Sequence, residues 1–104
     1  MNEANLQKEI MLAVSKSGAI VWRQNTGALP DKNGRLVQFG LCKGSSDLIG
    51  ICPDGRFLAL EIKGLRGKPT DAQLRFIEAV KRKGGRAGVC WSVKDALDVL
   101  AQVV

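Results

Sequence analysis

The feature that most constrains the fold is a Pro-Asp-Gly turn signal at residues 53–55, between two short apolar runs. Proline presets φ for the first turn position, and glycine supplies the position with φ above zero. We therefore expect residues 47–52 and 57–63 to form a hairpin that pairs Cys52 with Arg56. The same register sets Asp47 opposite Glu61.

The remaining elements follow from hydrophobic periodicity and helix-capping signals. We predict helices at residues 2–16, from 70 to the glycines at 84–85, and from 93 onward, with further strands at 19–22 and 87–91. The glycine-rich segment 25–44 predicts a hairpin or extended loop with a strand at 36–39. The predicted fold is α/β, a small mixed β-sheet flanked by helices in the order α-β-(hairpin)-β-β-α-β-α. Its length fits one domain, residues 1–104.

Composition restricts the chemistry. The chain has no histidine, which excludes Ser-His-Asp and Cys-His triads. Its cysteines, Cys42, Cys52 and Cys90, form no Cys-x-x-Cys pair, so zinc sites of the usual kind are excluded and buried thiols are expected. Any catalysis must use carboxylates, lysine and a hard metal ion.

The net charge of +6 favours a polyanionic partner, nucleic acid before an anionic membrane surface. No apolar run is long enough to span a bilayer, and the first residues lack the pattern of a signal peptide. We therefore expect an intracellular, cytoplasmic protein with no membrane partner.

Polar residues interrupt the apolar pattern at the end of the second hairpin strand. Alternation along residues 57–63 places the apolar side chains on one face and Glu61 and Lys63 on the other. The hairpin register adds Asp47 to the polar face. Two carboxylates suit Mg²⁺ (or Mn²⁺), and the main-chain carbonyl of Ile62 could supply a third oxygen. The alternative is a surface salt bridge beside a solvated aspartate.

Asp47 followed by Glu61-Ile62-Lys63 resembles the D…(D/E)-x-K motif of restriction-endonuclease-like nucleases. More narrowly, the chain resembles a stand-alone VRR-NUC domain of the phage type over almost its whole length. The resemblance implies that Asp47, Glu61 and Lys63 catalyse metal-dependent hydrolysis of DNA phosphodiester bonds. One departure from the superfamily pattern is Ser46, where proline commonly precedes the aspartate.

The resemblance also matches Glu9 and Gln73 to supporting catalytic positions. Pattern alone leaves alternatives open for both residues. Glu9 lies at the edge of a helical apolar stripe, where a solvated side chain is equally reasonable. Gln73 follows Thr70 by three residues, so it can belong to a capping box.

Several polar residues near the proposed site are candidate DNA contacts, although Arg23 and Asn25 could equally just end a strand. Trp22 and Trp91 stand in strand contexts, and we expect both in the core. The candidate DNA contacts are Arg23, Asn25, Lys43, Ser45, Arg66 and Lys68.

These observations predict a metal-dependent DNA endonuclease that selects branched DNA such as Holliday junctions. The alternative is a non-catalytic DNA-binding or scaffolding module that retains the nuclease fold. Segment 26–43 carries apolar side chains that the core does not need. Packing against a second copy of the chain would bury them, which predicts a homodimer. The alternative is a hairpin that folds back on its own domain. The phage resemblance implies a phage-encoded protein in a bacterial host.

Overall fold

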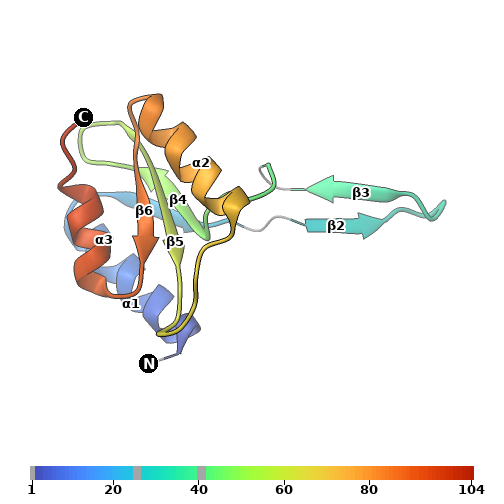
Figure 1. The fold of residues 1–104 in the computed structure, drawn as a ribbon, viewed down its shortest axis with the longest axis horizontal. Helices are drawn as coiled ribbons and strands as arrows, with labels where there is room; N and C mark the ends of the chain where they lie inside the picture. Colours follow the sequence, from blue (N-terminus) through green and yellow to red (C-terminus); the bar gives the residue numbers. More distant parts are fainter. Residues whose placement is uncertain (1, 25–26, 40–41) are drawn as a thin grey trace.

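The computed structural model describes residues 2–24, 27–39 and 42–104. It confirms the predicted order of elements and the α/β class (Figure 1). The helices are α1 (Glu3–Lys16), α2 (Asp71–Arg82) and α3 (Val93–Leu100). The strands are β1 (Ile20–Arg23), β2 (Gly27–Pro30), β3 (Leu36–Phe39), β4 (Leu48–Ile51), β5 (Phe57–Ile62) and β6 (Arg86–Cys90).

Four strands form a mixed sheet in the order β1-β4-β5-β6. β1 and β5 each pair with β4 in antiparallel orientation, whereas β6 runs parallel to β5. Leu48 lies opposite Leu60, and the Cys52 N–H donates to the carbonyl oxygen of Arg56 at 2.8 Å. The hairpin register expected from the turn signal is therefore confirmed.

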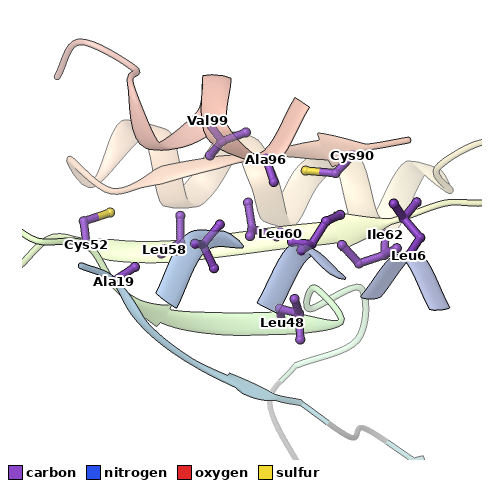
Figure 2. Close-up of a cluster of buried hydrophobic side chains, with 12 residues drawn as sticks. Leu6, Ala19, Leu48, Cys52, Leu58, Leu60, Ile62, Cys90, Ala96 and Val99 are labelled. Atoms are coloured by element: carbon purple, nitrogen blue, oxygen red, sulfur yellow. The ribbon is translucent and has the colours of Figure 1, made fainter. Parts of the chain in front are cut away.

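The two faces of this sheet are covered differently. Leu58, Leu60 and Ile62 of β5 are fully buried against α1 and α3 (Figure 2). On the other face, α2 packs on a smaller cluster that includes Ala59 and Ile77. Strand alternation thus places the even-numbered residues of β5 in the larger core and Glu61 on the sheet face that α2 covers.

Local side-chain hydrogen bonds fix where α2 and α3 begin. Thr70 and Gln73 form the expected reciprocal capping box at α2. At α3, the hydroxyl of Ser92 accepts from the Asp95 N–H, but the Asp95 carboxylate accepts from the N–H of Trp91 instead of closing a second box. Capping bonds of this kind satisfy N–H groups that the first helical turn leaves free.

The β2–β3 hairpin forms a separate two-stranded sheet that extends away from the four-stranded sheet (Figure 1). It does not fold back on its own domain, which was the alternative to the predicted dimer contact. Leu29, Leu36 and Val37 are 62%, 74% and 50% exposed. This hairpin, residues 27–39, is called the arm below. Part of its surface is apolar, and nothing in the described structure covers that part.

The structure corrects the expectation for three side chains. Trp22 and Trp91 are 44% and 43% exposed, so neither is a core residue. β1 is an edge strand, and Trp91 follows the last residue of β6, which explains the exposure of both. Cys42 is exposed, whereas Cys52 and Cys90 are buried as expected. Among the described residues, no helix is long and apolar enough to cross a membrane.

Candidate active site

Asp47 and Glu61 come together at one end of the β4–β5 hairpin. The main chain of Asp47 continues the sheet, because its carbonyl oxygen accepts from the Gln24 N–H at 2.7 Å. Its side chain reaches across to β5, where Oδ2 accepts from the N–H of Ile62 at 2.8 Å. This bond orients the Asp47 carboxylate toward the strand that carries Glu61.

Glu61 is a buried acid, only 2% exposed. Burial, together with the neighbouring Asp47 carboxylate, raises its pKa from 4.5 to about 8. Its Oε1 has no hydrogen-bond partner in the described structure. A buried carboxylate beside another one is stable only with a proton or a cation between them. A protonated Glu61 can donate to Asp47, and a metal ion can replace that proton.

Lys63 only partly compensates the two acids. Its Nζ lies 3.7 Å from Oε2 of Glu61, and its side chain is 16% exposed. The lysine lowers the pKa of Glu61, but less than burial and Asp47 raise it. The ammonium group therefore sits at the rim of the carboxylate pair, partly open to solvent.

Glu3, which the sequence analysis did not select, approaches the same site from α1. Its Oε2 accepts from the N–H of Gly64 at 3.3 Å, and its charge also raises the pKa of Glu61. The signal for it was available, because Glu3 continues the buried helical stripe of Leu6 and Ile10. Glu9 is exposed and is not among the charges that act on Glu61 in the described part of the chain.

Gln73 is occupied by the capping box. Its Oε1 accepts from the Thr70 N–H at 2.8 Å, so capping accounts for its position. The start of α2 also lies against the segment before Asp47, since a β-carbon on Gly44 would collide with the main chain of Ala72. Gly44 has a φ of +86°, which favours glycine at this close approach.

The candidate DNA contacts are spread around the same end of the sheet. Arg66 and Lys68 are exposed in the loop 64–69, which passes beside the start of α1 (Figure 1). Arg23 and Lys43 are exposed on the chain segments that lead to and from the arm, while Ser45 is half-buried. Asn25 lies outside the described residues.

Two carboxylates and one main-chain oxygen fit a magnesium-type ion. The N–H and carbonyl of one strand residue point to the same edge, so the Ile62 carbonyl lies on the side of Asp47. In the described ranges, no group of three or more His, Cys, Asp or Glu residues could hold a metal ion by itself. Mg²⁺ needs no such cage, because it keeps several waters and takes oxygen ligands from substrate phosphates.

Comparisons with known proteins identify the family and the fold. The family model of the VRR-NUC domain matches residues 1–94. A solved structure described as a VRR_NUC domain superposes with a TM-score of 0.64 and 25% sequence identity, over 98% of this chain and 97% of the other. A search of curated proteins finds no match.

Proposed function

The chain belongs to the VRR-NUC domain family, a family of nuclease type, and we propose that it is a metal-dependent endonuclease that hydrolyses DNA phosphodiester bonds. The proposed catalytic residues are Asp47, Glu61 and Lys63. Glu3 takes the supporting place on α1 that the sequence analysis gave to Glu9. Gln73 is proposed to act through α2, by holding the helix start beside the site.

One observation carries this proposal, the buried Glu61 beside Asp47 with an unsatisfied oxygen. Burying two carboxylates together is costly, and a purely structural site would pair each with a cation. Bound Mg²⁺ or Mn²⁺ would polarise the scissile phosphate and lower the pKa of a water. Asp47, Glu61 and the Ile62 carbonyl are the proposed ligands.

The chain's own groups supply the other steps. Asp47 is held by the N–H of Ile62, so its carboxylate is oriented before substrate binds. Nζ of Lys63, at the rim of the pair, stabilises negative charge on the reacting phosphate or takes a proton from the attacking water. Glu3 holds the N–H of Gly64 and so fixes the start of the basic loop.

The loop 64–69 is the proposed phosphate-backbone contact. Arg66 and Lys68 are exposed beside Lys63, and the net charge of +6 adds a long-range attraction for DNA. Arg23, Lys43 and Ser45 would continue this contact toward the arm.

Branched DNA and a homodimer complete the proposal. One chain carries one proposed catalytic site, and resolving a four-way junction needs two symmetric incisions. The exposed apolar residues Leu29, Leu36 and Val37 of the arm give a second copy a surface to bury.

The proposal is tested by incubating the protein with labelled linear, flap and four-way-junction DNA, with Mg²⁺, Mn²⁺ or EDTA. We expect cleavage only with metal, fastest at junctions, and a dimer by light scattering. Full activity in EDTA would refute the metal requirement. Tight DNA binding without cleavage under any metal would instead support the non-catalytic DNA-binding or scaffolding module.

A further inference from the structure

Trp91 is held at the active-site end of the sheet with much of its surface exposed. It directly follows β6, and its indole Nε1–H donates to the carbonyl oxygen of Gly67 at 2.8 Å. The only polar atom of the side chain is thereby satisfied, yet the residue is 43% exposed. An aromatic side chain fixed by its polar edge presents an apolar surface at little entropic cost.

The residue that anchors Trp91 packs directly on Lys63. A β-carbon added to Gly67 would lie 3.3 Å from Cβ of Lys63. Gly67 therefore lies between the indole and the proposed catalytic lysine. The strand register agrees with this placement. Ile62 pairs with Cys90, so the next residues, Lys63 after β5 and Trp91 after β6, also lie side by side.

The turn formed by residues 64–67 is fixed at several points. The Gly67 N–H donates to the Gly64 carbonyl at 2.9 Å, and the Gly64 N–H donates to Glu3. Leu65 occupies the tip of this turn and is 90% exposed. Leu65 and Arg66 of this loop and Trp91 after β6 are thus all exposed to solvent near Lys63.

We propose that Trp91 is a stacking platform for an unpaired DNA base next to the scissile phosphate, with Lys63, Arg66 and Lys68 on the adjoining backbone. The proposal rests on the proposed nuclease function and names the substrate feature that the site reads. Single-stranded nucleic acid is bound by aromatic surfaces set among cations. A base inside an intact duplex is already stacked and paired, so the platform favours a branch point.

The first test measures binding without cleavage, in the Asp47→Asn background. Affinities for a short oligothymidylate and for a blunt duplex are compared by fluorescence anisotropy in EDTA. Trp91→Leu is expected to weaken oligothymidylate binding about 5- to 150-fold, the range for losing one stacked base, and to change duplex binding less than about twofold. Trp91→Phe, which keeps a ring but loses the bond to Gly67, should retain most of the affinity.

Trp22 offers a matched control. It is exposed to a similar extent, but it lies on the opposite edge strand, away from the loop 64–69. Trp22→Leu should leave both affinities unchanged. The platform proposal would be overturned if Trp91→Leu weakened single-strand and duplex binding equally, or weakened neither. Circular dichroism spectra check that each variant is folded, and if Trp91→Leu is not, the quenching of Trp91 emission in Trp22→Phe decides the question.

Fluorescence gives an independent reading, since the chain has two tryptophans. In Trp22→Phe, Trp91 is the remaining one, and oligothymidylate should quench its emission. In Trp91→Phe, the emission of Trp22 should not change. Quenching of Trp22 but not of Trp91 would contradict the proposal. Neither assay needs turnover, so a protein that never cleaves refutes the nuclease function alone, whereas normal cleavage without quenching refutes the platform alone.

Discussion

Two acid–base pairs lie at opposite ends of β5 and differ in almost every physical respect. At the start of the strand, Oδ1 of Asp54 lies 2.8 Å from Nη1 of Arg86, and the Asp54 side chain is 46% exposed. At the end of the strand, Glu61 is 2% exposed and its nearest cation, Lys63, lies 3.7 Å away. Hydrogen bonding from Arg86 lowers the pKa of Asp54, whereas burial raises that of Glu61 to about 8.

The difference separates a structural pair from the proposed catalytic one. Asp54 joins the hairpin turn to β6, and its charge is compensated by a direct contact and by water. Glu61 is shielded from solvent, and its one ion-pair partner in the described structure, Lys63, lies 3.7 Å from Oε2, so its charged form is poorly stabilised by the protein alone. Natural proteins keep such groups where function requires them.

The largest expected effect is on catalysis. Glu61→Gln should lower the cleavage rate by at least about 10²–10³, because one charged contact to the reacting centre is lost. The free energy of unfolding at neutral pH should not fall, since glutamine replaces a buried carboxyl group that is uncharged below its pKa of about 8. Cleavage rates and denaturant titrations check both parts. Asp54→Asn is the matched control, and an equal loss of rate in it would erase the distinction between the two ends.

Lys63→Ala should lower turnover far more than DNA affinity. Its ammonium group borders the carboxylate pair, so it acts on the reacting phosphate and not on the duplex at large. Charge reversal at Arg66 and Lys68 should do the opposite, weakening binding and flattening the salt dependence by about 0.9 per lost phosphate contact. Single-turnover rates and binding at several salt concentrations separate the effect on turnover from the effect on affinity. Equal losses of affinity in Lys63→Ala and in the loop variants would argue against these separate roles.

The pH dependence of stability should be opposite at the two ends. The folded pKa of Glu61 is about 8, above its ordinary value of 4.5, so its protonated form favours the folded state. That contribution is complete below about pH 4.5 and is lost as pH rises through 8. Thermal unfolding in EDTA should show this decline, and Glu61→Gln should flatten it. A decline of the same size in the variant would assign the effect to another group.

The smallest effect belongs to Asp54. Its folded pKa lies below the ordinary value of 3.8, so its contribution is present above that value and is lost as pH falls through the folded pKa. Asp54→Asn should lower the thermal midpoint slightly at neutral pH and leave cleavage unchanged, because exposed ion pairs contribute little. A midpoint equal to wild type would show that the bond to Arg86 is not needed.

Local patterns predicted much of this structure. The turn signal determined the register that sets Asp47 opposite Glu61, and strand alternation placed Glu61 and Lys63 away from the main core. Capping residues predicted where α2 and α3 begin. These features depend on residues close in sequence, whose geometry is set by backbone dihedrals and short hydrogen bonds.

Contacts between distant segments were decided only by the packed fold. The packing of α1 against the sheet brings Glu3, and not Glu9, beside Gly64. The parallel crossover through α2 sets Trp91 next to Gly67 and leaves the residue 43% exposed. Periodicity along one helix or strand says which side chains share a face, but not which neighbour that face meets, because packing of whole elements selects the partner.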